Sequence, residues 1–178
     1  MLVETIEHNG FKIEIHQDQD AESPREWDNL GTMICAHKRY CLGDIQTSKP
    51  TIPDDAIVLP LFLYDHSGIS MSVGREYPFN CPWDAGQVGV IYVTREKALE
   101  EFSAKRLTKA IRDKAIKCMV QEVETYDLFI RGEVYGYIIK DDEDNDLGSC
   151  WGFIGMDHCL EDAKSQADGA KSSLTYAI

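Results

Sequence analysis

Hydrophobic and polar positions alternate at both ends of the chain, and this pattern predicts strands there. From Val3 to Ile15 the alternation runs on either side of Asn9-Gly10, the dipeptide that most favours a tight hairpin turn. Near the C-terminus, two apolar runs flank a polar, acidic turn. We therefore predict an N-terminal hairpin over residues 1–16 and a second hairpin over residues 133–155.

The middle of the chain carries the most apolar strand signals. Val58 to Tyr64 is too short and too apolar for a surface element, and the turn-forming Trp83-Asp84-Ala85-Gly86 runs directly into a β-branched stretch. We predict core strands over residues 57–94. If these strands pair, their polar ends, which carry Asp65, His66 and Asp84, lie on neighbouring loops.

From Thr94 onward the apolar positions change to a three-and-four spacing, which is typical of a helix. We predict one long helix over residues 95–123, with a bend or break between Glu122 and Asp127. Asp157 can cap a last, short helix over residues 157–168. The apolar positions of the long helix are Leu99, Phe102, Leu107, Ala110, Ile111, Ala115, Cys118, Met119 and Val123.

The segment between the first hairpin and the core strands is rich in loop signals. Ser23-Pro24 is a helix start, with Ser as the N-cap and Pro at the first position. Thr32 to Tyr40 fits either a short strand or a helical turn. The order of elements predicts an α+β fold, with an antiparallel sheet of hairpins packed against one long helix and one or two short helices. Since no linker is visible, we expect a single domain over residues 1–178.

The formal net charge is −13 and it is unevenly distributed. Residues 95–117 carry +4, whereas residues 118–178 carry −9. Such a charge repels phosphates overall, which makes direct nucleic-acid binding unfavourable and steers the protein toward basic partners. The basic helix face of residues 95–117 could bind nucleic acid, but we favour this hypothesis less than the two given at the end of this section. We expect no cofactor.

Neither a secretion signal nor an apolar run long enough to span a membrane is visible, so we expect a soluble, cytoplasmic protein. The six cysteines include no Cys-x-x-Cys pair and are expected to be reduced and mostly buried. A zinc site assembled from distant Cys and His is the less favoured alternative. No metal motif is present. The cysteines are Cys35, Cys41, Cys81, Cys118, Cys150 and Cys159.

Asp65, His66 and Asp84 are the candidate catalytic residues, because histidine titrates near neutral pH and strand ends feed the loops on which sites are built. The alternative is a histidine hydrogen-bonded in a turn beside a capping aspartate. His37 and Cys41 would share one face of a helix with the spacing of metal ligands, although one pair is weak evidence for a site.

Two further sets of side chains have both a functional and a structural interpretation. Glu122, Glu124 and Asp127 can supply carboxylates to a divalent metal or can form an exposed acidic helix end. A recognition surface can be formed by Trp27-Asp28, Trp83-Asp84 and Trp151, although a tryptophan beside a turn is equally often a core residue. Gly86 and Gly89 match no phosphate-binding loop and more simply allow close packing or a bulge.

Five segments resemble a family of small acidic proteins that occurs widely in phages and mobile elements. The resemblance runs from about residue 10 to residue 160 and implies a phage-type accessory protein that acts in the host cytoplasm. It implies no catalytic residue, because the family has no established activity. The segments are DAESPREWDNLGTM (20–33), VLPLFLYDHSGISM (58–71), CPWDAGQVGVIYV (81–93), ETYDLFIRGEVYGYII (124–139) and SCWGFIG (149–155).

Two functional hypotheses follow from charge and resemblance. The first is a binding protein that inhibits a host defence or nucleic-acid-handling complex by occupying a basic surface, in part by imitating the charge of DNA. The second is a small hydrolase or nuclease, with or without a metal, that uses Asp65, His66 and Asp84. The binding residues expected under the first hypothesis are Trp27, Asp28, Trp83, Asp141, Asp142, Glu143, Asp144 and Asp146.

Overall fold

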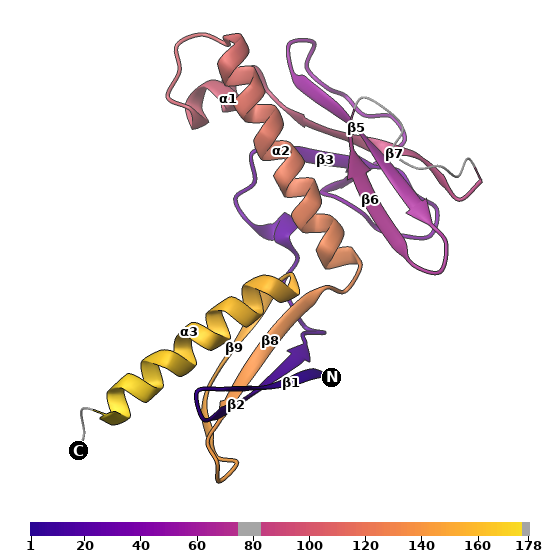
Figure 1. The fold of residues 1–178 in the computed structure, drawn as a ribbon. Coiled ribbons are helices and arrows are strands. Elements are labelled where there is room, and N and C mark those ends of the chain that lie inside the picture. The colour runs from indigo at the N-terminus through magenta and orange to yellow at the C-terminus, as the bar shows by residue number, and fades with distance from the viewer. Residues whose placement is uncertain (75–82, 176–178) are drawn as a thin grey trace. The chain divides into compact units, whose positions relative to one another are not determined.

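The computed structural model describes residues 1–74 and 83–175. Within these residues the chain divides into two compact units (Figure 1). The terminal unit consists of Met1–Glu22 and Gly132–Ile178, and the central unit consists of Ser23–Arg131. Each unit has its own sheet and its own hydrophobic cluster.

The terminal unit is a four-stranded antiparallel sheet with the strand order β1-β2-β8-β9. Asn9 and Gly10 both have positive φ angles, 53° and 91°, as the tight turn between β1 and β2 requires. α3 packs along β8 and β9 (Figure 1). The elements are β1 (Leu2–His8), β2 (Phe11–Gln17), β8 (Val134–Lys140), β9 (Asp146–Ile154) and α3 (Met156–Thr175).

Alternation along β2 and β8 builds the core of the terminal unit. Every second side chain of β2 is buried, and so are Tyr137 and Ile139 of β8. α3 contributes Cys159, Ala163 and Ala167, whose spacing of four residues places them on one helix face. Because these three side chains are small, the helix can approach the sheet closely.

The central unit is a five-stranded sheet with the order β4-β3-β7-β5-β6, in which only β3 and β4 are parallel. α2 packs against β6 and neighbouring strands (Figure 1). Gly89 of β7 has no room for a side chain, since an added Cβ would lie 1.9 Å from the carbonyl oxygen of Ile34. The elements are η1 (Pro24–Glu26), β3 (Thr32–Cys35), β4 (Ile45–Gln46), β5 (Ile57–Asp65), β6 (Ile69–Val73), β7 (Ala85–Val93), α1 (Arg95–Glu101) and α2 (Lys109–Ile130).

A partly buried ion-pair network joins the loop around η1 to α2. The side chain of Arg25 is only 5% exposed and contacts Asp44 at 2.7 Å and Glu122 at 3.2 Å. Glu122 also accepts hydrogen bonds from the backbone N–H groups of Leu30 and Gly31. Arg25 therefore has a structural role, because it holds the loop around η1 against α2.

The α+β class and both predicted hairpins are confirmed. The prediction of one sheet was incomplete, since the structure has two among the described residues. The single domain over residues 1–178 stays a prediction. Ser23 caps η1 as expected, and Thr32–Cys35 is a strand rather than a helical turn.

The single helix predicted over residues 95–123 is wrong, because two helices occupy this region and the second continues to Ile130. Ser103 adopts a left-handed φ of 47° just after α1, and the side chain of Thr108 accepts a hydrogen bond from the N–H of Ile111 to start α2. The helix is continuous between Glu122 and Asp127, where we expected a bend or break. The last helix is longer than residues 157–168.

Two expectations about the whole chain can be compared with the described residues. Cys35 and Cys159 are buried, whereas Cys41 and Cys150 are exposed and Cys118 is intermediate. Cys81 lies outside the described residues. Among residues 1–74 and 83–175, no helix is long and apolar enough to cross a membrane.

Candidate functional site

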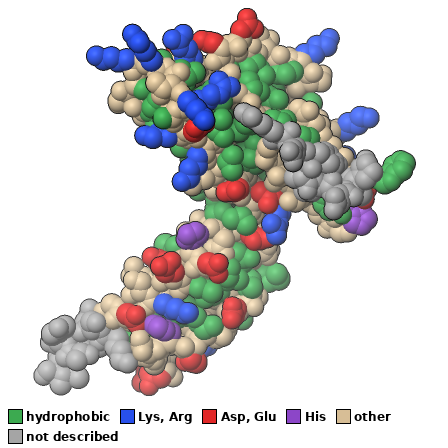
Figure 2. Space-filling view, turned by 45° about the horizontal axis from the view of Figure 1, so that its top comes forward, with side chains coloured by type: hydrophobic (Ala, Val, Ile, Leu, Met, Phe, Trp, Pro, Cys, Tyr) green, Lys and Arg blue, Asp and Glu red, His purple; other side chains and the backbone are tan. Residues whose placement is uncertain are grey.

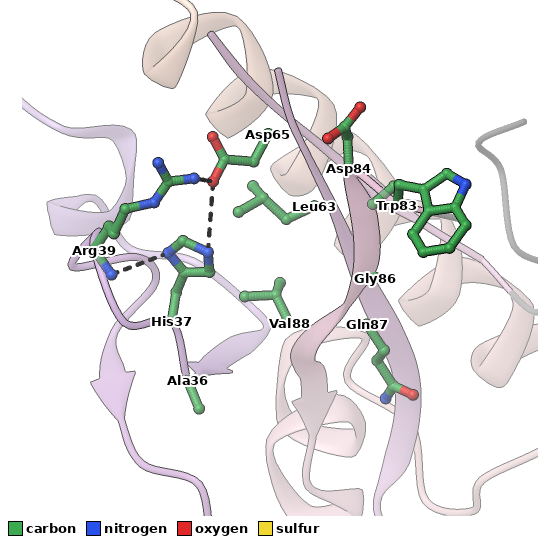
Figure 3. A pocket seen from close by; sticks show the side chains of 11 residues that line it. Ala36, His37, Arg39, Leu63, Asp65, Trp83, Asp84, Gly86, Gln87 and Val88 are labelled. Carbon is green, nitrogen blue, oxygen red and sulfur yellow. Dashed lines mark hydrogen bonds and ion pairs between the residues drawn. The ribbon is translucent and has the colours of Figure 1, made fainter. Parts of the chain in front are cut away.

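A pocket of about 310 Å³ lies in the central unit where β5 ends and β7 begins (Figure 3). The two strands pair up to Tyr64 and Ala85, and the backbone N–H of Asp65 donates to the carbonyl oxygen of Asp84 at 2.7 Å. The loop after β3 closes another side of the pocket. The polar and aromatic side chains that line it are those of His37, Arg39, Asp65, Trp83, Asp84 and Gln87.

Asp65 is held by three side chains from the loop after β3. Its carboxylate forms an ion pair with Arg39, accepts a hydrogen bond from the hydroxyl of Tyr40 at 3.4 Å, and lies 3.7 Å from Nε2 of His37. The side chain of Asp65 is 16% exposed, whereas that of Arg39 is 65% exposed. A carboxylate engaged in this way joins the loop to β5 and has limited freedom to act as a base.

His37 uses both of its ring nitrogens within the pocket (Figure 3). Nδ1 accepts hydrogen bonds from the backbone N–H groups of Arg39 and Tyr40, each at 3.3 Å. The ring proton of the neutral side chain is therefore on Nε2, which faces Asp65. His37 also stacks on Tyr40, with the ring centroids 5.1 Å apart. These contacts leave no free lone pair for proton abstraction and favour a role in positioning the loop.

His66 and Asp84 form a second, separate pair. Nδ1 of His66 lies 3.4 Å from a carboxylate oxygen of Asp84, and the histidine side chain is 62% exposed. The Asp84 carboxylate lies on the Nδ1 side of the ring, the same side as in an aspartate–histidine dyad, at ion-pair distance. The structure thus places the three predicted residues close together but divides them between two sets of contacts.

The acidic turn between β8 and β9 is held by its own carboxylates. Asp141 accepts hydrogen bonds from the backbone N–H groups of Glu143 and Asn145 and from the side-chain amide of Asn145, and these bonds lower the pKa of Asp141. A hydrogen bond from Lys12, at 2.6 Å, lowers the pKa of Asp144.

The remaining carboxylates of this turn differ in their contacts. Asp146 lies 3.8 Å from Lys140. Asp142 and Glu143 have exposed side chains that form no ion pair with any described residue. Two of the five predicted binding carboxylates are thus fully available to a partner.

The negative charge is concentrated in one unit. The terminal unit has 16 acidic and 4 basic side chains, a formal charge of −12, although it holds fewer than half of the residues. The central unit has 15 acidic and 14 basic side chains, a charge of −1. Figure 2 shows Lys and Arg gathered over the central unit. The net charge of −13 for the whole chain therefore comes almost entirely from the terminal unit, and the central unit is nearly neutral.

The three tryptophans have different local surroundings, with Trp27 and Trp83 in the central unit and Trp151 in the terminal unit. Trp83 is 91% exposed beside the pocket, and Trp27, which is followed by the exposed Asp28, lines a different groove of about 250 Å³. Trp151 belongs to the terminal unit and lies over Gly136, where an added Cβ would be 2.3 Å from the ring.

Of the three α2 carboxylates that we considered as metal ligands, Glu122 and Asp127 have structural partners, and Glu124 is exposed. Glu122 binds Arg25, and Asp127 accepts hydrogen bonds from the hydroxyl of Ser70 and the backbone N–H of Met71. In the part of the chain that the structure describes, no group of three or more His, Cys, Asp or Glu side chains could hold a metal ion. The segment around His37 and Cys41 is not helical, so the predicted i, i+4 ligand pair does not form.

Sequence reasoning missed the partners of Asp65, although it singled out His37 as a candidate metal ligand. The contacts span 25 residues or more, and only the pairing of β3, β7 and β5 brings them together. A histidine followed two and three residues later by the residues that donate to it gives no recognised pattern.

Comparison with known proteins gives no family assignment. No family model matches the sequence, and no curated protein or solved structure matches it. What the chain does must therefore be argued from its own residues.

Proposed function

We propose that this chain is an acidic binding protein that inhibits a host nucleic-acid-handling or defence complex by occupying a basic surface on it. The observation that supports the proposal is the concentration of charge, −12, in the terminal unit. The motif resemblance supports a phage-type protein that acts in the host cytoplasm. Under this proposal, the terminal unit is the part of the chain that we expect to contact the partner.

A charge of this density can act on a partner in two ways, through its long-range electrostatic field and through direct ion pairs with basic side chains of the partner. The field raises the rate at which a basic partner is encountered, and a surface that binds DNA phosphates is basic in the same way. The four basic side chains of the terminal unit can neutralise only a quarter of its 16 acidic ones. The surplus carboxylates, such as Asp142 and Glu143, are available to a partner.

The test is affinity capture of the tagged chain from bacterial lysate at low and at moderate salt, followed by competition with duplex DNA. A stoichiometric complex that is lost as salt rises and is displaced by DNA supports the proposal. The double variant Asp142→Asn with Glu143→Gln should weaken capture, because it removes two unpaired charges without breaking the turn. Asp54→Asn with Asp55→Asn, two exposed acids of the central unit, is the matched control.

A captured complex that is indifferent to salt, to DNA and to the Asp142/Glu143 variant would contradict the proposal. An equal loss of binding in the Asp54/Asp55 control would show that the charge of the whole chain matters and that the terminal unit has no special role. Both results can be read from the same set of captures.

A hydrolase that uses the His66–Asp84 dyad is the second candidate, and the 3.4 Å contact between these side chains favours it. Such an enzyme would use Nε2 of His66 as the base, with Asp84 orienting the ring. A hydrolytic activity on nucleotide or ester substrates should then be lost in His66→Ala and fall by orders of magnitude in Asp84→Asn. An activity unchanged in both variants would exclude the dyad.

A further inference from the structure

A groove of about 670 Å³ lies in the terminal unit between α3 and the β8–β9 hairpin. Its walls come from the helix-facing side of the two strands and from one side of α3. β9 is the edge strand of its sheet, and Asp146 to Gly152 are exposed along it. The groove therefore opens beside a free sheet edge. Its lining includes Tyr137, Ile139, Leu147, Phe153, Asp162 and Gln166.

Two glycines line this groove. Gly148 faces it from β9 and Gly169 from α3, and a Cβ added to either would meet no other part of the described residues within 4 Å, apart from the adjoining backbone. Neither glycine has a positive φ angle. Glycine weakens a strand and costs about 1 kcal/mol relative to alanine inside a helix. Neither a positive φ angle nor crowding by the described residues requires glycine at these positions, and the missing side chains leave space on both walls of the groove.

The chemistry of the lining suits a cation on an aliphatic stem. Ile139, Leu147 and Phe153 supply apolar surface, and Leu147 is 47% exposed. Asp162 supplies a carboxylate, which accepts a hydrogen bond from the hydroxyl of Tyr137 at 2.7 Å. Burial, and then the hydrogen bond to Asp162, raises the pKa of Tyr137, so that the hydroxyl stays protonated. Arginine and lysine bury their stems along apolar surface and keep the charged group beside a carboxylate.

The strand beside the groove limits how a partner can lie. The β8–β9 register shifts twice, between Tyr135 and Tyr137 and between Ile139 and Lys140, so Gly148 to Cys150 is a regular stretch between two bulges. Bulges shorten the usable edge and protect it against unselective pairing. A partner could pair with only this short stretch, so that specificity must come from the groove.

We propose that the groove beside Gly148 and Gly169 receives an arginine or lysine side chain from an extended basic segment of the partner protein, which lies along the edge of β9. The inference rests on the proposed function and adds the docking site and the chemistry of the segment. Charge complementarity with a unit of −12 selects a basic partner over an acidic or neutral one.

The experiment uses the full chain and a short fluorescein-labelled peptide in which arginine alternates with valine, with binding followed by fluorescence anisotropy. Gly148→Phe fills the groove without changing any charge, so the electrostatic attraction stays the same. We expect it to weaken peptide binding by about ten-fold. Gly169→Leu fills the groove from the helix and should act similarly. Thr51→Phe is the control, because this position is exposed, lies outside any helix or strand and belongs to the central unit.

The outcomes separate the groove from the charge. The groove proposal is contradicted if both groove-filling variants bind the peptide as the natural protein does, while Asp142→Asn with Glu143→Gln binds it more weakly. This result would leave the proposed acidic binding function intact. A peptide with glutamine in place of arginine that binds equally well overturns the cationic ligand, and an apolar ligand or a second copy of the chain would then be the occupant. Absence of any salt-sensitive binding of the arginine peptide would contradict both proposals. Circular dichroism checks that each variant folds. If Gly148→Phe does not fold, Gly169→Leu is used in its place.

Discussion

Arg25 is the residue on which the loop around η1 depends most. Its guanidinium contacts two carboxylates and also donates to the carbonyl oxygen of Gly31 at 2.7 Å. Burial lowers the pKa of Arg25, but the bonds to Asp44 and Glu122 outweigh it and raise the pKa above the usual value. The charge is thus stabilised by its partners, and the partners in turn require the charge.

We predict that Arg25→Met destabilises the protein by about 2 to 4 kcal/mol, because it leaves two carboxylates without their cation. The value lies below that of a fully buried pair, since the side chain of Asp44 is still 24% exposed. Urea denaturation measures the free energy of unfolding. Arg112→Met, at an exposed position of α2, is the matched control and should change it by less than about 0.5 kcal/mol. Equal effects of the two variants would contradict the structural role of Arg25.

The acidic turn should make stability depend on pH in the acid range. Hydrogen bonds from Asn145 and Glu143 lower the pKa of Asp141 below its usual 3.8, and the bond from Lys12 lowers that of Asp144. Each group therefore binds fewer protons in the folded state than in the unfolded state. Their stabilisation is present above about pH 4 and is lost as the pH falls through the lowered values.

We predict that melting temperatures fall more steeply below pH 4 in the natural protein than in Asp141→Asn. The variant keeps the shape of the side chain but removes the group that titrates. Asp142→Asn, whose carboxylate forms no ion pair with a described residue, should keep the steep dependence. Parallel slopes in all three proteins would show that Asp141 does not contribute.

At the scale of elements, local chemistry predicted the hairpins and failed at the helix. Asn9-Gly10 fixes the first turn by itself, and an acidic turn between two apolar runs was enough for β8 and β9. The break between α1 and α2 contains neither Gly nor Pro, and the apolar spacing continues across it through Phe102 and Leu107. A left-handed serine at position 103 leaves no trace in such a pattern.

The candidate site was predictable to the same extent. Strand pairing was visible in the sequence, so the meeting of Asp65 and Asp84 could be expected and is found. The side-chain partners of Asp65 could not be predicted, because Arg39 and Tyr40 reach it from a loop whose position depends on the whole sheet. The helical spacing of His37 and Cys41 misled for the same reason.

Thr108 marks the true start of α2, and we predict that Thr108→Ala costs about 1 kcal/mol. The substitution removes the side-chain oxygen that accepts a hydrogen bond from the N–H of Ile111. Thr108→Ser should retain most of the stability, because it keeps this acceptor. Thr51→Ala, at an exposed position outside any helix or strand, is the control. A helix that ran unbroken through position 108 would tolerate or prefer alanine, and this outcome would contradict the break.

At the scale of the whole molecule, charge is separated by the fold and not by the order of the sequence. The acidic residues of positions 1–22 and of positions 132–178 are distant in the chain but belong to one unit. Segment charges counted along the sequence therefore divide this unit into two, and the net charge of −13 hides a central unit that is nearly neutral.

This separation predicts how stability responds to salt. With 16 acidic and only 4 basic side chains, repulsion within the terminal unit outweighs its few ion pairs, such as that of Lys12 with Asp144. The screening length falls from about 30 Å at 0.01 M salt to about 10 Å at 0.1 M, which weakens the repulsion among exposed carboxylates. We therefore predict that the melting temperature rises as sodium chloride is added from low concentration.

The same measurement on charge variants tests the origin of the effect. The double variant Asp142→Asn with Glu143→Gln has less repulsion within the terminal unit even at low salt, so its melting temperature should rise less as salt is added. The double variant Asp54→Asn with Asp55→Asn, in the central unit, should show almost the same rise as the natural protein. Potassium chloride should act like sodium chloride, because screening depends on ionic strength and not on the identity of the cation. A melting temperature that falls with added salt would mean that ion pairs such as Lys12–Asp144 outweigh the repulsion, and the terminal unit would then be held together by the charges that we expect to strain it.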